Sequence, residues 1–336
     1  MEGISDAVVR RLLAGLGGMD VCVTEFVRVV QRPSSPKVLL RSCPELGRGG
    51  RTPNGVPVMV QLLGGDAALV AESAQVAVDL GALGIDLNFG CPAKKVNGHD
   101  GGAALLRTPE RVRRVVDRVR RAVPGAIAVS AKIRLGWDDP NQVQDIAAAA
   151  EDGGADWLTI HGRTKVQMYR GQADWGRIGE VARRRRVPVV ANGDLFDPDA
   201  LRRCAEITGC RAFMLGRGAF RRPNLFRWLR GLDRDPWPVA SSMCLLLRFI
   251  DGVTTDPRYR DGPRVALGRL KGWLRALSEA EPNFTTCFDR VKRLHDLDEA
   301  RSALSAFNAS AGSTTLPGPL PGPGRPESAF ATAPPA

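Results

Sequence analysis

A short apolar strand turns into a polar loop in the stretch Ile85-Asp86-Leu87-Asn88-Phe89-Gly90-Cys91-Pro92-Ala93-Lys94-Lys95. The strand pattern ends at Asn88, and the loop that follows contains glycine, proline and two lysines and presents one cysteine. In α/β barrels the loops after the carboxyl ends of the strands carry the catalytic residues. The stretch therefore predicts one strand of a parallel sheet with chemistry at its carboxyl end.

Similar strands alternate with helical patterns along the first two thirds of the chain. β-Branched runs predict strands over residues 21–24, 57–62, 85–88, 127–133, 157–161, 188–191 and 212–215. Helical patterns lie between them over residues 67–83, 109–123, 142–153, 175–186 and 198–208, and several end at glycine. This order is the signature of βαβ units around a parallel sheet.

The number of predicted strands is one fewer than a closed (β/α)8 barrel needs. Residues 4–13 read as the helix that would follow a first strand, with only Met1-Glu2-Gly3 before it. An open, doubly wound sheet is the other arrangement that these strands allow. We expect an α/β fold, a (β/α)8 TIM barrel over residues 1–230 whose first strand belongs upstream of Met1.

The strand signals stop after Arg222-Pro223. Residues 239–309 read as helices separated by prolines, and they contain many arginines, which predicts a small C-terminal helical domain. From Ser310 the composition turns to Pro, Gly, Ala, Ser and Thr. Such a composition buries too little apolar surface to fold, so residues 310–336 are predicted to be a disordered tail.

The charge balance favours a polyanionic partner. Lys and Arg number 48 and Asp and Glu 36, which leaves a formal charge of +12. Such an excess is typical of proteins that bind nucleic acid. Only seven of the basic residues are lysine, so arginine-rich codon usage is an alternative explanation.

Cysteine spacing and hydropathy exclude several classes of protein. The seven cysteines are scattered without a C-x-x-C pair, which argues against a disulfide framework and against a zinc site. The sequence has no signal segment and no apolar run near the roughly 18 residues that a membrane span needs. We expect a cytoplasmic protein with no metal and no membrane partner.

Polar residues occupy two further strand ends. Lys132 and Arg134 share one face of an extended chain, because residues two apart point the same way, and His161 ends the next strand. A lysine between apolar neighbours suits an anionic or electron-rich ligand. Plainer alternatives remain: Cys91 as a small buried hydrophobic residue, Lys132 as a surface lysine, and His161 as a core residue.

Two glycine turns end the last strands and look like anion-binding loops: Asn192-Gly193-Asp194 and Gly216-Arg217-Gly218. Backbone N–H groups in such turns bind phosphate, and barrels commonly bind phosphate in the loops after strands seven and eight. Neither a Walker-type loop nor a strand-linked G-x-G-x-x-G motif is present. With Lys132 and His161, the turns predict a pocket for a phosphorylated cofactor, FMN rather than ATP or a dinucleotide.

Five motifs together closely resemble the tRNA-dihydrouridine synthase family. They are Leu87-Asn88-Phe89-Gly90-Cys91-Pro92, Lys132-Ile133-Arg134-Leu135-Gly136-Trp137, Ile160-His161-Gly162-Arg163-Thr164, Ala191-Asn192-Gly193-Asp194 and Gly216-Arg217-Gly218. Thr24-Glu25-Phe26-Val27-Arg28-Val29-Val30 and Arg51-Thr52-Pro53-Asn54-Gly55 look most like subfamily C, which modifies the uridine at tRNA position 16. Family members begin with a short apolar strand before Met-Glu-Gly, which agrees with the expected first strand.

The resemblance implies an FMN-dependent barrel, a helical tRNA-binding domain and a role for each matching residue. Cys91 matches the catalytic proton donor. The positions that match cofactor contacts are Met1, Glu2, Gln61, Lys132, His161, Asn192, Gly193, Asp194, Gly216 and Arg217. The positions that match the uridine pocket or a tRNA-binding face are Arg28, Asn88, Arg134, Arg269, Lys271 and Arg275.

The reaction that the resemblance implies is reduction of the C5–C6 double bond of uracil. NADPH, or NADH, reduces the flavin, the flavin passes hydride to C6, and Cys91 protonates C5 of a base flipped out of the tRNA. We expect a monomer. Two alternatives stay open: an FMN barrel for a small pyrimidine, of the dihydroorotate dehydrogenase type, and a flavin-free RNA-binding protein on a decayed barrel.

Overall fold

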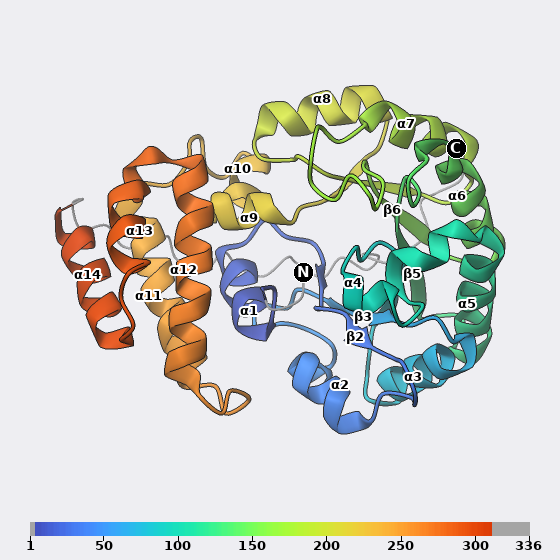
Figure 1. Ribbon diagram of the computed structural model, residues 1–336, viewed down its shortest axis with the longest axis horizontal. Helices are drawn as coiled ribbons and strands as arrows, with labels where there is room; N and C mark the ends of the chain where they lie inside the picture. Colours follow the sequence, from blue (N-terminus) through green and yellow to red (C-terminus); the bar gives the residue numbers. More distant parts are fainter. Residues whose placement is uncertain (1–3, 311–336) are drawn as a thin grey trace.

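The structure is a computed structural model that describes residues 4–310. Figure 1 shows a curled sheet surrounded by helices and, beside it, a separate group of helices, α11–α14. The predicted cofactor contacts Met1 and Glu2 and the predicted tail beyond Ser310 lie outside the described residues. Ser310 itself, predicted to begin the tail, is the last residue of α14 (Leu297–Ser310).

Parallel strands form the sheet. They are β1 (Cys22–Val23), β2 (Val27–Arg28), β3 (Val58–Leu63), β4 (Gly84–Asn88), β5 (Ala128–Arg134), β6 (Trp157–His161), β7 (Val189–Asn192) and β8 (Ala212–Met214). Neighbours follow the order β1-β3-β4-β5-β6-β7-β8, and β2 also pairs with β3. The predicted parallel sheet is confirmed, and β2 is the one strand that the sequence pattern did not predict.

The sheet curls like a barrel wall but does not close among the described residues. Within residues 4–310, β1 and β8 are not paired with each other. A closed (β/α)8 barrel has one more strand at such a gap. The fold is α/β, of the TIM-barrel type, with a C-terminal helical region, which confirms the predicted fold class.

Helices cover the outer face of the sheet (Figure 1). The helices α3 (Ala67–Asp79), α5 (Pro109–Ala122), α6 (Val143–Asp152), α7 (Trp175–Arg184) and α8 (Pro198–Thr208) match predicted segments. Aspartates at positions 66, 174 and 197 cap α3, α7 and α8, because each side chain accepts a hydrogen bond from the first turn. Four short helices in the connections were not predicted: α2 (Pro36–Ser42), α4 (Lys94–Asn97), α9 (Arg217–Arg221) and α10 (Leu225–Leu229).

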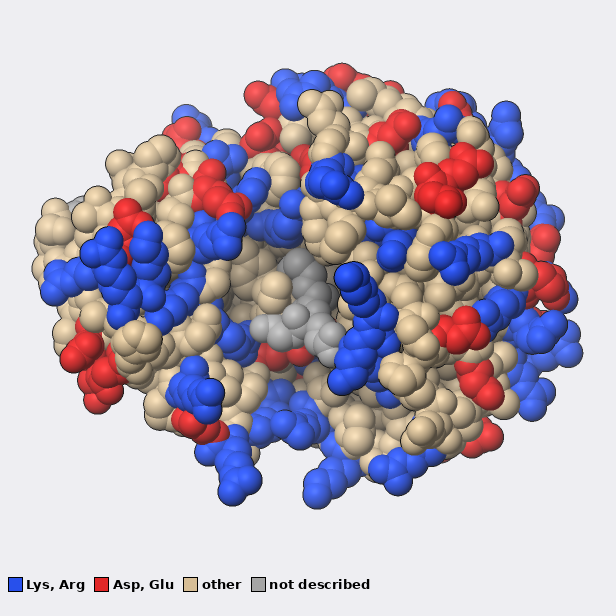
Figure 2. Space-filling model, in the orientation of Figure 1, with Lys and Arg blue, Asp and Glu red and all other residues tan. Residues whose placement is uncertain are grey.

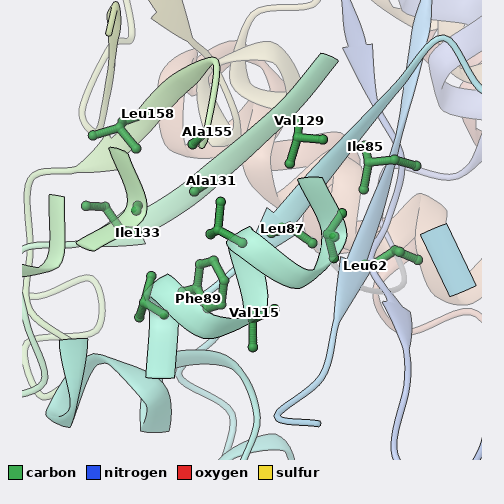
Figure 3. Packing of buried hydrophobic residues seen from close by; sticks show 14 of the residues in the cluster. Leu62, Ile85, Leu87, Phe89, Val115, Val129, Ala131, Ile133, Ala155 and Leu158 are labelled. Atoms are coloured by element: carbon green, nitrogen blue, oxygen red, sulfur yellow. The ribbon is translucent and has the colours of Figure 1, made fainter. Parts of the chain in front are cut away.

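The main core lies between the sheet and these helices. Figure 3 shows side chains from β3 to β6 packed with Val115 of α5 and with Phe89. Leu62, Ile85 and Ile133 are fully buried. Burial on both faces explains why these strands read as nearly continuous apolar runs. The polar residues within these strands are therefore exceptions to the core pattern and are candidates for a functional role.

A second core joins α1 (Ala7–Leu16) to α11 (Val239–Thr254), α12 (Gly262–Ala280), α13 (Thr285–Val291) and α14. At its centre, the Trp273 ring makes edge contacts with Phe220 and Phe249, each at 5.1 Å between centroids. The helix α1 thus belongs by sequence to the predicted barrel domain but packs with the C-terminal helices. Among residues 4–310, no helix is long and apolar enough to cross a membrane.

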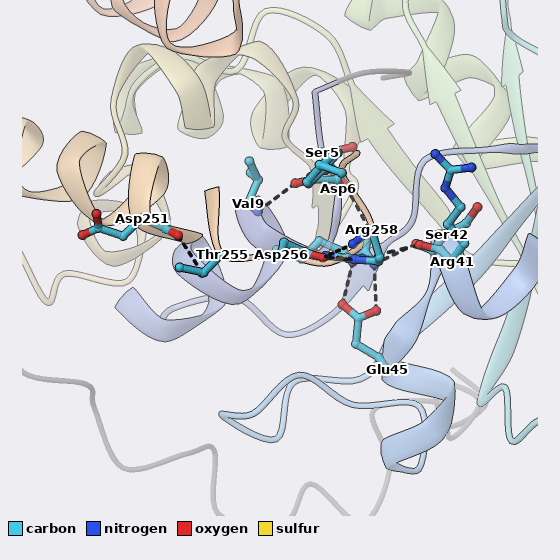
Figure 4. A network of polar contacts seen from close by, with 12 residues as sticks. Ser5, Asp6, Val9, Arg41, Ser42, Glu45, Asp251, Thr255, Asp256 and Arg258 are labelled. Carbon is cyan, nitrogen blue, oxygen red and sulfur yellow. Dashed lines mark hydrogen bonds and ion pairs between the residues drawn. The ribbon is translucent and has the colours of Figure 1, made fainter. Parts of the chain in front are cut away.

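Buried ion pairs hold α1 in place. The guanidinium of Arg10 is 2.7 Å from the Glu45 carboxylate and also donates to the carbonyls of Ser5 and Ser42. Figure 4 labels its partners Ser5, Ser42 and Glu45. The capping residue Asp6 accepts hydrogen bonds from Arg269 of α12 at 2.6 and 3.0 Å. These contacts tie the barrel part to the helical part.

Candidate active site

The carboxyl edge of the sheet brings most of the predicted site residues together. The strand register pairs Asn88 with Lys132, Arg134 with His161, and His161 with Asn192. The strands β5, β6 and β7 thus end at one level, and β4 ends two residues earlier. The register therefore brings these predicted site residues side by side at one edge of the sheet.

The loop that carries Cys91 is held by hydrogen bonds around the cysteine itself. The carbonyl of Cys91 accepts from the backbone N–H of Ala103 and from the side-chain amide of Asn97, both at 3.2 Å. Gly102 has a φ of +60°, and a Cβ at this position would lie 3.1 Å from the Cβ of Cys91. Cys91 is partly exposed, so its thiol sits in a fixed loop that a ligand can reach.

Lys132 is the central cation of the site. Its ammonium donates to the side-chain oxygen of Asn192 at 3.1 Å, and the Asn192 amide donates in turn to the carbonyl of Met214 at 2.7 Å. The pKa of Lys132 is lowered to about 8, chiefly by burial and also by the charge of nearby Arg134, while the charge of Asp86 acts in the opposite direction. Lys132 is thus a weakly solvated cation that remains mostly protonated at neutral pH.

His161 is buried and neutral. Burial, and after it the positive charges of Lys132, Arg134 and Arg163, lower the pKa of His161 far below its usual range. The guanidinium of Arg163 lies 3.4 Å from His161 Nε2. Because a guanidinium can only donate, Nε2 is the acceptor and Nδ1 carries the proton. His161 can therefore act as a neutral hydrogen-bond donor through Nδ1.

Arg134 links the Cys91 loop to the loop between β6 and α7. Its guanidinium donates to the carbonyls of Gly90 at 2.7 Å, Thr164 at 3.0 Å and Met168 at 2.9 Å, and its side chain is 2% exposed. Burial lowers the pKa of Arg134 to about 10. Backbone carbonyls thus accept hydrogen bonds from several N–H groups of Arg134, the residue for which the sequence predicted contact with uridine or tRNA.

The Asn192-Gly193-Asp194 turn is tightly built. Gly193 has a φ of +124°, and a Cβ there would lie 2.9 Å from the Cβ of Ala173 and 3.0 Å from the His161 ring. The Asp194 carboxylate accepts from Arg163 at 2.5 Å, from the Ala173 N–H at 2.8 Å and from Arg217 at 3.2 Å. Since that carboxylate is occupied by two arginines, the turn offers an anion its backbone and Arg217, not Asp194.

Several residues of the site were missed from the sequence. Asp86 and Ser130 lie inside the sheet and hydrogen-bond to each other at 2.6 Å, and Arg163 organises His161 and Asp194 as described above. Tyr169 lies beside the guanidinium of Arg217, 4.6 Å from the ring centroid. The sequence did contain a signal for Asp86: it is a carboxylate between the apolar residues Ile85 and Leu87, and a buried strand rarely contains a carboxylate unless the site uses it.

The residues predicted to meet tRNA occupy several places. Arg28 is at the end of β2 and borders a small cavity with Lys95 and His99. Arg269 is bound to Asp6, so in this structure its guanidinium joins the two parts of the molecule instead of pointing to a ligand. Its neighbour Lys271 donates to the Leu294 carbonyl at 2.6 Å.

Arg275, in contrast, keeps 72% of its side chain exposed and pairs only loosely with Glu279, at 3.4 Å. It lines a cavity of about 360 Å³ between the barrel and helical parts, with Arg217, Arg221 and Trp273. Figure 2 shows Lys and Arg side chains gathered around the hollow between the two parts. The lining of the cavity includes four arginines: Arg217, Arg221, Arg269 and Arg275.

Comparisons with known proteins support one family. A family model described as dihydrouridine synthase (Dus) matches residues 1–307. A tRNA-dihydrouridine(16) synthase from Pasteurella multocida (strain Pm70) is 43% identical over 88% of this chain and 94% of its own length. The tRNA-dihydrouridine(16) synthase of Escherichia coli (strain K12) is 42% identical over 92% of this chain and 96% of its own length.

A solved structure supports the fold alone. Histamine dehydrogenase from Rhizobium sp. 4-9 matches with a TM-score of 0.53 at 14% identity, and the match covers 73% of this chain and 46% of that one. The family match, in contrast, extends over nearly the whole chain and confirms the resemblance seen in the five motifs. The chain belongs to the dihydrouridine synthase family, a family of flavin-dependent oxidoreductases.

Proposed function

We propose that this protein reduces the C5–C6 double bond of the uridine at position 16 of tRNA, with FMN as cofactor and NADPH, or NADH, as reductant. The observation that carries the proposal is the convergence of Cys91, Lys132 and neutral His161 at one edge of the sheet. The names of the two relatives support the substrate and the position.

The residues at this edge fit FMN. Lys132 offers a weakly solvated cation and Gln61 an amide, and we assign both to the ring of the cofactor. The Asn192-Gly193-Asp194 turn can offer backbone N–H groups to a phosphate, and Arg217, which donates to Asp194 of this turn, keeps 37% of its side chain exposed for the same anion. When bound, FMN would supply the hydride that C6 of the uracil receives.

Cys91 is the proposed acid for C5. Hydride addition at C6 leaves negative charge at C5 and O4, and the proton from Cys91 Sγ completes the C5–H bond. The Cys91 loop is fixed through Asn97, Ala103 and Gly102, so the thiol does not have to be ordered when the substrate arrives. The thiolate that remains must regain a proton from solvent before the next turnover.

Lys132 and His161 stabilise charge on the opposite side of the reaction. With a pKa of about 8, Lys132 is mostly protonated at pH 7 and can balance negative charge on an electron-rich ring. His161 stays neutral and can donate from Nδ1 without adding a second full charge. Burial, and after it the cations around His161, lower the pKa of this residue and keep it from accepting a proton, which this division of roles requires.

The tRNA is the proposed partner, and it binds over the hollow between the barrel part (residues 1–230) and the helical part (residues 239–309). A uracil within folded tRNA must leave its stack to reach the strand ends, at a cost of a few kcal/mol. Phosphate contacts with exposed cations such as Arg275 and Lys95 offset that cost. We further propose that the protein acts as a monomer in the cytoplasm, where its substrate is found.

The proposal is tested with the purified full-length chain, FMN, NADPH and unmodified tRNA. We expect an absorbance band near 450 nm and formation of dihydrouridine. Cys91→Ala should lose at least about 100-fold in rate with normal flavin content, whereas Cys244→Ala, a partly exposed cysteine of α11, should react normally.

Three results would contradict the proposal in different ways. Normal turnover by Cys91→Ala excludes Cys91 as the acid. Reduction of a free pyrimidine with kinetics that do not depend on salt supports the small-molecule alternative. A colourless protein that still binds tRNA supports the flavin-free RNA-binding alternative.

A further inference from the structure

A buried carboxylate lies directly beneath the proposed site. Asp86 is 1% exposed and belongs to β4, where it pairs in register with Gln61 of β3 and Ser130 of β5. Side chains two residues apart in a strand share a face, so Asp86 and Asn88 point the same way, as do Ser130 and Lys132. The register places these two pairs beside each other on the inner face of the sheet.

A chain of hydrogen bonds runs from Asp86 to the Cys91 loop. One carboxylate oxygen accepts from Ser130 Oγ at 2.6 Å and the other from Gln61 Nε2 at 2.5 Å. Gln61 Oε1 accepts from Asn88 Nδ2 at 2.8 Å, and Asn88 Oδ1 accepts from the Gly90 N–H at 3.0 Å. Gly90 immediately precedes Cys91, so the chain joins the interior of the sheet to the catalytic loop.

The two ends of this chain determine its direction. A carboxylate can only accept, so Gln61 must turn its NH2 group toward Asp86 and its oxygen toward Asn88. A backbone N–H can only donate, so Asn88 must turn its oxygen toward Gly90 and its NH2 group toward Gln61. Both ends require the same orientation of both amides, so each link of the chain joins one donor to one acceptor.

The charge of Asp86 also acts on Lys132. The charged and titratable groups that influence Lys132 are Asp86 on β4, Arg134 on its own strand, and His161 on β6, which is neutral. Burial and Arg134 disfavour the protonated lysine, whereas the charge of Asp86 and the hydrogen bond to Asn192 favour it. Burial in turn raises the pKa of Asp86, while Ser130, Gln61 and Lys132 oppose that rise.

We propose that Asp86 is a positioning residue of this enzyme, whose carboxylate orients the Gln61–Asn88 amide chain and keeps the ammonium of Lys132 charged. The relevance of this role to catalysis rests on the proposed function, whereas its effect on Lys132 can be measured without any reaction. Asp86 is 1% exposed, and its carboxylate hydrogen-bonds to Gln61 and Ser130. It acts through Gln61, Asn88 and Lys132.

The test replaces the carboxylate without changing its shape. In Asp86→Asn, the new side chain can still accept from Gln61 and donate to Ser130 Oγ, so the amide chain persists and only the charge is lost. The full-length chain is labelled with ¹⁵N-lysine, and NMR follows the titration of its seven lysines without tRNA or added cofactor. The Lys132 signal is assigned by its loss in Lys132→Met.

The expected result is a Lys132 midpoint near 8 in the wild type and about one pH unit or more lower in Asp86→Asn. The matched control is Ser130→Ala, which removes a hydrogen bond to the carboxylate but keeps its charge, and its midpoint should move less. If Asp86→Asn does not fold, Asp86→Ser is the second neutral variant, with the same expected drop. A Lys132 midpoint that stays the same in the neutral variant overturns the proposal.

Activity separates this inference from the proposed function. In an active enzyme, the alkaline limb of the rate–pH profile should move to lower pH in Asp86→Asn by the same interval as the Lys132 midpoint, with rates at pH 6 closer to those of the wild type. A shifted midpoint in a protein that makes no dihydrouridine would leave the Asp86–Lys132 coupling intact and refute the proposed function. If the wild type makes dihydrouridine and the Lys132 midpoint is the same in Asp86→Asn, the proposed function stands and the Asp86–Lys132 coupling is refuted.

Discussion

Lys132→Met should make the protein more stable and inactive. The reason is the pKa of Lys132, which burial lowers from the ordinary 10.5 to about 8. A lysine whose pKa falls on folding is protonated in both states below pH 8, and there the folded state bears the full cost of the buried charge. Between pH 8 and 10.5 the unfolded chain holds more protons than the folded one, so the free energy of unfolding rises with pH.

The size of the effect follows from the two pKa values. The gap between 10.5 and about 8 corresponds to about 3 kcal/mol at roughly 1.4 kcal/mol per pH unit. Methionine would also lose the hydrogen bond to Asn192, worth about 1 kcal/mol, and Asp86 would lose its positive neighbour. We therefore expect Lys132→Met to gain about 1–2 kcal/mol at pH 7.

The assay is urea unfolding of the wild type, Lys132→Met and Lys37→Met at pH 7 and pH 10. Lys37 is an exposed lysine of α2 and serves as the control for removal of one positive charge. The advantage of Lys132→Met over the wild type should shrink toward pH 10, because the wild-type lysine loses its proton there. Titratable groups that all three proteins share change their free energies of unfolding with pH in the same way, so these contributions cancel in the comparison.

Two results would refute this reasoning. One is a Lys132→Met protein that is less stable than the wild type at pH 7, which would mean that the cation is stabilised by its surroundings. The other is a stability difference that is the same at pH 7 and pH 10, which would mean that Lys132 titrates normally.

Three further predictions concern the structure around the site. Gly193→Ala should cost about 2 kcal/mol or more in urea unfolding, because φ is +124° and the new Cβ would meet Ala173 and His161. In the control Gly171→Ala, φ is +67° with open space, so the cost should be only about 1 kcal/mol. Arg269→Met should lose about 2–3 kcal/mol by leaving the buried Asp6 carboxylate without its cation, whereas exposed Arg275→Met should stay within about 0.5 kcal/mol. The affinity for tRNA, measured by filter binding, should fall as salt rises, and Arg275→Met should reduce the log–log slope by about 1; an unchanged slope would remove Arg275 from the interface.

The strands and the edge that carries the site could be predicted because both depend on local pattern. Apolar runs bounded by glycine and proline marked the strands, and a polar residue at a strand end marked Lys132, Arg134 and His161. Parallel strands place their carboxyl ends together, so a sequence that contains several such ends also predicts that they meet. The two-residue strand β2 is too short for such a pattern to detect.

The residues that hold the site in place could not be predicted in this way, because their partners are distant in sequence. Asp86 contacts Ser130, 44 residues away, and Arg269 contacts Asp6, 263 residues away. The predicted tRNA contact Arg269 and the predicted phosphate-side residue Asp194 both proved to be paired with protein groups. Residue type and position suggested a charged site for each, but only the folded chain shows which charge is already neutralised.

The most direct measurement maps dihydrouridine at nucleotide resolution in tRNA from cells with and without the gene. The proposed function predicts that dihydrouridine disappears at position 16 alone and returns when the gene is restored, but not when it carries Cys91→Ala. Loss at a different position would contradict the proposed site of modification. Unchanged dihydrouridine at every position would contradict the proposed function itself.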